Sequence, residues 1–310
     1  MMGSVQPREE KLAAGLIIMV IAQMFFTGTD TSAKWLSLAG LPALQIAFVR
    51  YFIHFLLAIL VYLPREGLPA LKSNSPLKQF LRSTCLLGAT IFNFLALKYL
   101  PISVTTTISF AGPMLVTLLA IPLLGEKVGI HRFSAVCVAF VGVLVVVQPW
   151  DASFHPAMLL SLSVLLCGSI YYIVTRMLSG IDGNATMQLW SSGMGTVALL
   201  PLALSEWTWP VSIHTWVILC FVGFFGAAAH TIVAAAHRLA DASILAPIVY
   251  IQVFFATVSG ILVFGSWPTI STLAGGAIII ASGLYIWQRT SGRKPSGAPL
   301  GSISNYRHSS

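Results

Sequence analysis

The sequence contains little charge, and acidic residues are scarcest of all. Of its 310 residues, 8% are Asp, Glu, Lys or Arg, and only 9 are acidic. A soluble protein carries about 25% charged residues on average, so a soluble domain of this length is excluded. With 57% hydrophobic residues and a mean hydropathy of +0.87, the apolar excess extends along the whole chain. The composition indicates a membrane protein.

The sequence also lacks the motifs on which common membrane enzymes and channels depend. It contains no Walker A motif, no His-Glu-x-x-His zinc motif and no nucleophile elbow, so nothing is present to carry ATP, metal or serine hydrolysis. Neither a filter sequence nor a ring of charge indicates an ion channel. The 4 cysteines lie inside apolar segments without paired spacing. The sequence therefore predicts no enzyme, no cofactor and no metal site.

What the sequence has in abundance is apolar runs of about 20 residues, the length that crosses a bilayer core of about 30 Å. We expect an all-α membrane protein of ten transmembrane helices. The approximate limits of these spans are 12–33, 43–63, 80–99, 103–124, 131–147, 157–178, 186–204, 215–237, 243–264 and 270–287. The alternative for the first span is a cleaved signal peptide, but the run is followed by TGTDTSAKW, without a clear small-x-small cleavage site.

The basic residues sort by side when all ten spans cross. Fourteen of the 17 Lys and Arg residues, Arg82 among them, fall on the side of the N-terminus, only Lys34 and Lys98 fall on the other, and Arg50 lies within a span. Basic residues favour the cytoplasmic side, so we expect an inner-membrane protein with both termini in the cytoplasm. The positive net charge is then a topology signal, and no nucleic acid is expected as a partner. We predict that 288–310, rich in Gly, Ser and Pro, is a disordered cytoplasmic tail.

The two halves of the chain repeat each other. At a shift of about 140 residues, Gly125 matches Gly265 and Gly142 matches Gly283. We expect one five-helix repeat over 12–147 and a second over 157–287. Five is odd, so the second repeat enters the membrane from the opposite side, as in many secondary transporters. Small residues supply helix contacts in such bundles; candidates are Gly223, Gly226, Ala227, Ala228, Gly276, Ala277, Ala281 and Gly283.

Several stretches resemble a known family. They are DTSAKWLS, FVRYFIHF, LKYLPISVTTTISFAGPMLVTLLAIPLLGEKVG, LADASILAPIVYIQVFFATVSGILVFG and GGAIIIASGLYIW. From about residue 12 to 288 the chain is similar to EamA-type members of the drug/metabolite transporter superfamily. The resemblance implies two inverted repeats, a central cavity and alternating access. The chain departs from the family pattern at FGSWPT, where Ser266 replaces a common acidic residue.

One cation lies inside a span. Arg50 stands about 10 Å into the second span at 1.5 Å per residue, where a charge costs at least about 2.5 kcal/mol and needs a partner. Asp30 is the nearest acidic candidate, although it can also pair with Lys34 at i,i+4 spacing. Arg50 and Asp30 then either border the substrate or form a packing network.

Other intramembrane polar residues are candidates to bind substrate, with helix-to-helix hydrogen bonding as the alternative for each. His54 and His230 could also carry protons, since imidazole titrates near neutral pH. Pro113 and Pro247 interrupt the fourth and ninth spans as hinge candidates or static kinks. The complete set that we predict to bind substrate is Asp30, Arg50, Asn93, Tyr172, Trp190, His230, Tyr250 and Gln252.

These residues favour a secondary transporter for a small organic metabolite. Its predicted partners are that metabolite and the lipid bilayer; the sequence does not determine an oligomeric state. The stretches that carry the resemblance are similar to those of bacterial riboflavin importers and S-adenosylmethionine transporters, which makes riboflavin uptake the first expectation. The sequence also has 18 Phe, 8 Tyr and 8 Trp available to stack a flat ring. The alternative is an exporter or exchanger of amino acids or S-adenosylmethionine, whose charges Asp30 and Arg50 would bind.

Overall fold

The computed structural model describes residues 6–125, 129–152, 154–240 and 242–291, and within them it contains helices and loops but no strand. The first half comprises α1 (Gln6–Leu38), α2 (Ala43–Glu66), the 3-10 helix η1 (Leu68–Leu71), α3 (Pro76–Tyr99), α4 (Ile102–Ser109), α5 (Gly112–Leu124) and α6 (Ile130–Val147). The second half comprises α7 (Met158–Leu178), α8 (Asn184–Ser205), α9 (Ile213–Leu239), α10 (Ala242–Leu245), the 3-10 helix η2 (Ala246–Tyr250), α11 (Ile251–Phe264) and α12 (Ile270–Ser291).

The prediction of ten membrane helices is confirmed. Among the described residues, 9 segments are long and apolar enough to span a bilayer, with α4 and α5 together forming one of them. The tenth is α8, which is less apolar because it contains Asn184, Gln188 and several serines. At the chain's other end α12 continues to Ser291, past the expected limit of 287, and the rest of the expected tail lies outside the described residues.

Both predicted interruptions are present. The fourth span breaks between Ser109 and Gly112, and Pro113 lies in the first turn of α5. Pro247 lies at the start of η2, which precedes α11 in the ninth span. Proline removes one backbone hydrogen bond and its ring displaces the preceding turn, which accounts for both breaks. That the breaks act as hinges stays a prediction.

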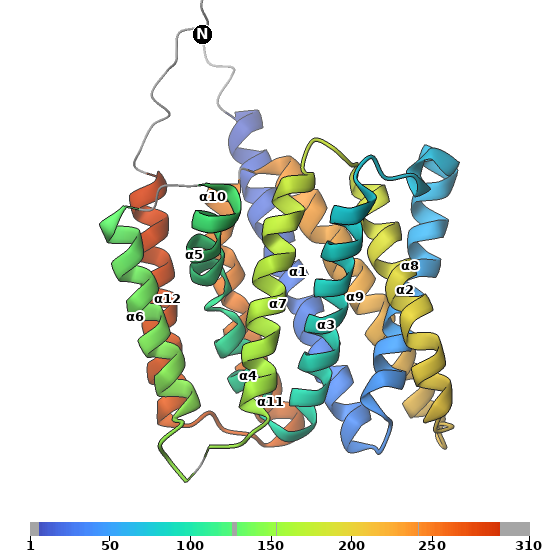
Figure 1. The fold of residues 1–310 in the computed structure, drawn as a ribbon. Helices are drawn as coiled ribbons and strands as arrows, with labels where there is room; N and C mark the ends of the chain where they lie inside the picture. Colours follow the sequence, from blue (N-terminus) through green and yellow to red (C-terminus); the bar gives the residue numbers. More distant parts are fainter. Residues whose placement is uncertain (1–5, 126–128, 153, 241, 292–310) are drawn as a thin grey trace, which may run out of the picture.

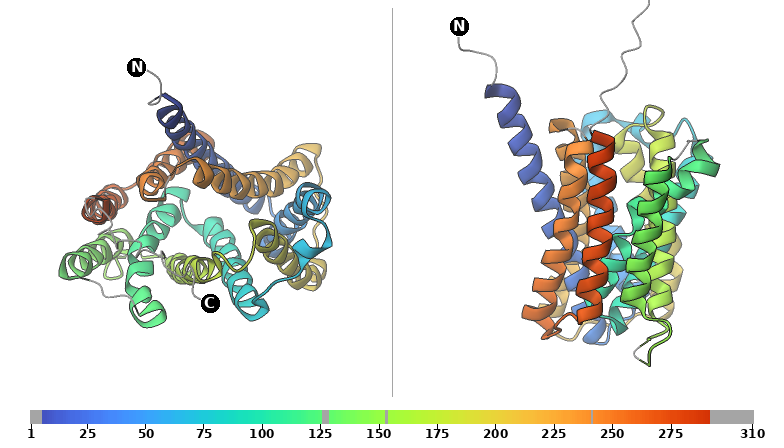
Figure 2. Two further views of the ribbon diagram at one scale, coloured as in Figure 1. Left: turned by 90° about the horizontal axis from the view of Figure 1, so that it is seen from above. Right: turned by 90° about the vertical axis from the view of Figure 1, so that its left-hand side faces the viewer.

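The helices of the two halves pack as an inverted pair. In Figure 1, α1 starts at the end of the bundle where α7 finishes, so equivalent helices run in opposite directions. α1 packs against α9, and its counterpart α7 packs against α3, while α2 faces α8 and α6 faces α12 (Figure 2). Exchanging the halves leaves this set of contacts unchanged. The start of α1 and the end of α12 lie at the same end of the bundle (Figure 1).

Glycines allow several helices to approach closely. A Cβ atom on Gly195 of α8 would lie 2.6 Å from Cγ of Tyr51, and one on Gly223 of α9 would lie 2.9 Å from Cγ2 of Ile53, so α2 sits tightly between α8 and α9. Gly283 of α12 similarly makes room for Tyr250. The expectation for Ala277 and Ala281 is wrong, because both lie on the exposed face of α12.

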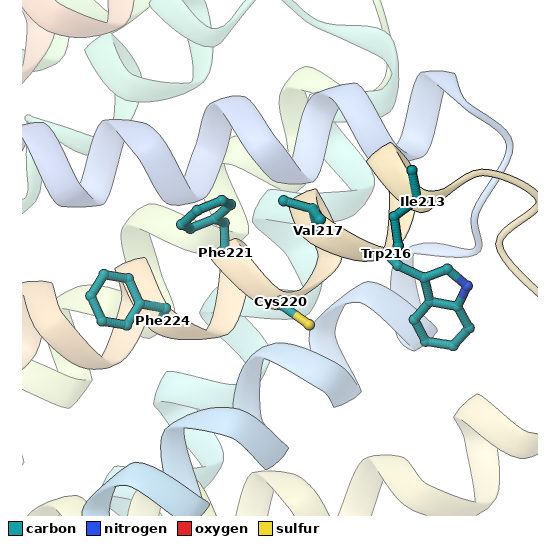
Figure 3. Close-up of a pocket in the computed structure, with 6 residues that line it drawn as sticks. All are labelled: Ile213, Trp216, Val217, Cys220, Phe221 and Phe224. Carbon is teal, nitrogen blue, oxygen red and sulfur yellow. The ribbon is translucent and has the colours of Figure 1, made fainter.

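The outer face of α9 carries an apolar groove (Figure 3). The residues that line it all belong to this one helix: Ile213, Trp216, Val217, Cys220, Phe221 and Phe224. Its lining is almost wholly apolar and faces away from the bundle, as expected for a surface that lipid covers. The groove is therefore no candidate for a polar substrate.

Candidate substrate-binding site

A polar cluster lies where α1, α2 and α3 meet. Asn93 of α3 donates a 2.9 Å hydrogen bond from its Nδ2 to Asp30 of α1. One turn earlier on α3, Thr90 accepts a 3.3 Å hydrogen bond from the NH1 group of Arg50, and its Oγ1 lies 3.0 Å from Tyr51 Oη. The structure thus brings together three predicted site residues, Asp30, Arg50 and Asn93, through neighbouring positions on α3.

The alternative pairing of Asp30 with Lys34 is not formed. Lys34 is 6% exposed, and its Nζ donates hydrogen bonds of 2.8 Å to the carbonyl of Leu97 and 2.6 Å to that of Leu100. The last carbonyls of a helix have no partner within it, and inside a bilayer water does not supply one. Lys34 therefore binds the end of α3 instead of pairing with Asp30.

Arg50 is 5% exposed and is held between α2, α3 and α9. Its guanidinium carbon lies 4.8 Å from the centre of the Tyr51 ring, a cation–π distance. Its Nε has no hydrogen-bond partner among the described residues, and the absent side chain of Gly226 leaves the space that the guanidinium occupies. An expected ion pair with Asp30 is not formed: Asp30 bonds Asn93, and Arg50 bonds Thr90.

Two histidines extend this cluster. The rings of His54 on α2 and His230 on α9 are stacked, with centroids 5.7 Å apart and an interplanar angle of 16°. Phe26 of α1 meets His230 edge-on at 5.2 Å. His54 is 4% exposed and its Nδ1 has no hydrogen-bond partner among the described residues. Aromatic surface and an unused polar atom therefore lie one helical turn from Arg50.

The remaining predicted site residues lie apart from this cluster. Tyr250 packs at 5.4 Å from the ring of Phe110 and reaches the sulfur of Met114 at 3.9 Å, in the contact region of α4, α5 and α12. Tyr172 is 62% exposed and meets the ring of Tyr171. Gln252 is half-buried on α11.

Trp190 departs furthest from expectation. Its Nε1 donates a 3.0 Å hydrogen bond to the carbonyl of Leu71 in η1, near the start of α8. The indole therefore holds a loop at one end of the bundle and does not join Asp30 or Arg50. A Trp N–H in an apolar environment needs an acceptor, and the sequence could not reveal that the acceptor is a backbone carbonyl 119 residues away.

Arg82 is an inner residue that the sequence analysis assigned to the membrane surface. It is 4% exposed and donates hydrogen bonds to Thr175 Oγ1 (2.8 Å), Tyr171 Oη (2.9 Å), Ser191 Oγ (2.7 Å) and the Met187 carbonyl (2.9 Å). Its guanidinium therefore joins α3 to α7 and α8. The signal was available, because Arg82 falls within the apolar run expected to form the third span.

Hydrogen bonds tie the two halves together at both ends of the bundle. At the end with the N-terminus, Asp182, between α7 and α8, accepts from Ser73 Oγ (2.5 Å), the Asn74 backbone N–H (2.8 Å) and Gln79 Nε2 (2.9 Å). At the opposite end, Gln45 of α2 exchanges two hydrogen bonds with the backbone of Thr208, of 2.8 and 3.0 Å. The first set joins α3 and the loop before it to the loop before α8, and the second joins α2 to the loop after α8.

The Asp182 cluster predicts a pH-dependent stability. Burial alone raises the pKa of this carboxyl, but the hydrogen bonds from Ser73, Gln79 and Asn74 outweigh it and hold the pKa below its usual value. The resulting stabilisation is present above about pH 4 and is lost as the pH falls through the lowered pKa. Asp182→Asn is therefore expected to reduce the free energy of unfolding by about 2 kcal/mol at pH 7.

Thermal unfolding in detergent at pH 7, 5 and 3 measures this effect. The difference between wild type and Asp182→Asn should be equal at pH 7 and pH 5 and shrink at pH 3. A difference that stays constant down to pH 3 would show that the ionised carboxylate is not what the three donors stabilise.

Comparison with known proteins agrees with the ten-helix architecture. The EamA-like transporter family matches the chain twice, over residues 13–148 and 155–288. The chain is 29% identical over 280 residues to a riboflavin transporter of Vibrio cholerae, covering 88% of this chain and 93% of that protein. It is 26% identical over 258 residues to an S-adenosylmethionine uptake transporter of Rickettsia prowazekii, covering 83% and 86%.

One crystal structure superimposes with a TM-score of 0.59 at 17% sequence identity, over 91% of this chain and 99% of that chain, a likeness that bears on the fold alone. The family matches leave little of the chain outside them and fall one on each half. The chain belongs to the EamA-like transporter family and is a multi-pass membrane transporter.

Proposed function

We propose that this transporter carries riboflavin into the bacterial cell by alternating access between its two halves. The observation that supports this most is the cluster of Arg50, Asp30 and Asn93, whose hydrogen-bonding groups are only partly used, beside the stacked rings of His54 and His230. Riboflavin combines a flat ring with carbonyl and imide N–H groups, so it calls for stacking surfaces and hydrogen bonds together. The similarity to a riboflavin transporter over most of the chain points the same way.

The same cluster favours a second candidate. Asp30 and Arg50 carry opposite charges and are held by Asn93 and Thr90, which lie one turn apart on α3. An amino-acid group offers an ammonium for the first and a carboxylate for the second. S-adenosylmethionine has both, and an S-adenosylmethionine uptake transporter is among the relatives. Transport or exchange of this metabolite or of amino acids is therefore the alternative.

The orientation follows from the charge distribution. We place both termini in the cytoplasm, because most Lys and Arg residues lie on that side and basic loops are retained there. Residues 12–147 and 157–287 then form the two units that move against each other across the inner membrane. In this arrangement the Asp182 cluster faces the cytoplasm and the Gln45–Thr208 contact faces outward.

Uptake of radiolabelled riboflavin by a bacterial strain that cannot synthesise it tests the proposal. The strain is compared with and without the gene at limiting external vitamin, with the protein detected in the membrane. We expect gene-dependent, saturable uptake that unlabelled riboflavin suppresses and S-adenosylmethionine does not. Equal uptake with and without the gene would overturn the riboflavin assignment, and suppression by S-adenosylmethionine would favour the alternative.

A further inference from the structure

Two buried arginines among the described residues, Arg50 and Arg82, differ in how much of their hydrogen-bonding capacity is used. All three guanidinium nitrogens of Arg82 donate to protein acceptors, in four hydrogen bonds. Arg50 donates one long bond of 3.3 Å to Thr90, and its Nε has no partner among the described residues. Native proteins satisfy nearly all buried polar groups. Arg50 therefore has donors, Nε among them, that no described residue uses and that a bound molecule can use.

Asp30 offers the complementary capacity. An ionised carboxylate has about four acceptor positions, and Asp30 receives one hydrogen bond, from Asn93. Lys34, the alternative cation that the sequence allowed to pair with Asp30, bonds the end of α3 instead. Asp30 is also half-buried, unlike Arg50, so one side of it is reachable. The carboxylate can accept further hydrogen bonds from a bound molecule.

The spacing of these two groups is fixed by α3. Thr90 holds Arg50 and Asn93 holds Asp30, and residues three apart on a helix have Cβ atoms about 5–6 Å apart. A donor-rich group and an acceptor-rich group are thus presented side by side.

We infer that Arg50 and Asp30 together bind a ligand edge in which a hydrogen-bond acceptor stands beside a donor. This inference rests on the proposed function: in riboflavin the edge is a pyrimidine-ring carbonyl, which accepts from Arg50, next to the imide N3–H, which donates to Asp30. The stacked pair of His54 and His230 supplies flat surface one turn away. An amino-acid zwitterion presents the same order of groups, with a carboxylate and an ammonium.

N3-methylriboflavin separates this inference from the proposed function, because methylation removes the N3–H donor and leaves the rest of the vitamin intact. In competition against radiolabelled riboflavin uptake, we expect the methylated compound to compete at least about tenfold more weakly than riboflavin in the wild type, since a site built around a hydrogen bond rejects an analogue that lacks it. In Asp30→Ala the two compounds should compete within about twofold of each other, because the acceptor is gone.

Asp182→Asn is the matched control, because it removes a carboxylate that lies in the Asp182 cluster and should keep the wild-type ratio. Asp30→Leu, which is close to Asp in size and also lacks an acceptor, is the second variant if Asp30→Ala does not reach the membrane. Equal competition by the two flavins in the wild type would overturn the inference while leaving riboflavin uptake intact.

Uptake of S-adenosylmethionine, with its decarboxylated form as competitor, forms the second arm. If riboflavin is not taken up but S-adenosylmethionine is, with the decarboxylated form at least about tenfold weaker, the donor-and-acceptor site is supported and the riboflavin assignment fails. If neither compound is taken up, both the inference and the proposed function are overturned.

Discussion

Arg50→Lys is expected to lower riboflavin uptake at limiting concentration by about 100-fold while leaving the folded protein nearly as stable as the wild type. Lysine keeps the charge but replaces a planar group of five N–H donors with a single ammonium, so it cannot fill the same ligand contacts. Stability should change little, because Arg50 makes one long hydrogen bond to the protein. Uptake per molecule in the membrane, together with the thermal unfolding midpoint in detergent, measures both effects.

Arg82→Lys is the matched control, and its expected effects are opposite. The three nitrogens of the Arg82 guanidinium donate four hydrogen bonds to α7 and α8. The ammonium of a lysine reaches fewer of these acceptors, so buried groups are left without a partner. The free energy of unfolding should fall by about 3 kcal/mol, while the KM for uptake by the folded molecules stays unchanged. Loss of transport by Arg82→Lys without loss of stability would contradict this division of roles, as would normal transport by Arg50→Lys.

The crossing of α6 and α12 depends on two glycines. A Cβ atom on Gly275 would lie 2.6 Å from the carbonyl oxygen of Gly142, and one on Gly142 would lie 2.9 Å from the carbonyl oxygen of Gly275. Both obstacles are backbone atoms, which cannot rotate away as a side chain can. Gly275→Ala must therefore separate the helices, and we expect the free energy of unfolding to fall by about 3 kcal/mol.

Unfolding in detergent compares Gly275→Ala with Ala277→Val, a substitution on the exposed face of the same helix. The second variant should remain within about 0.5 kcal/mol of the wild type. Similar stabilities for the two variants would mean that α6 and α12 can move apart freely.

Helix number and breaks could be predicted from the sequence because they depend on local properties. A run of about 20 apolar residues has few alternatives to a membrane helix, and proline removes a backbone hydrogen bond from a helix interior and so favours a bend or break there. Pro113 and Pro247 accordingly mark the observed breaks. The odd number of spans in each repeat likewise required the inversion that the packing of α1 on α9 and α3 on α7 displays.

Partners of the buried polar residues could not be predicted because they depend on which helices meet. Lys34 had an acidic residue one turn away, yet it bonds carbonyls at the end of α3, a helix 63 residues further along the chain. The sequence analysis placed Arg82 at the membrane surface, whereas in the structure acceptors on α7 and α8 surround its guanidinium. Trp190 likewise donates to a backbone carbonyl, that of Leu71, which its position in the sequence does not reveal. Sequence spacing identifies which groups need partners, and tertiary packing decides which partners they find.

Counterflow with the purified protein in liposomes tests the central claim most directly. Vesicles are loaded with unlabelled riboflavin, diluted into a trace of radiolabelled riboflavin, and compared with vesicles loaded with S-adenosylmethionine and with vesicles lacking protein. We predict that internal riboflavin accelerates entry of the label in protein-containing vesicles, and that S-adenosylmethionine does not. Label entry that is independent of the internal solute, or equal in vesicles without protein, would contradict riboflavin transport by alternating access.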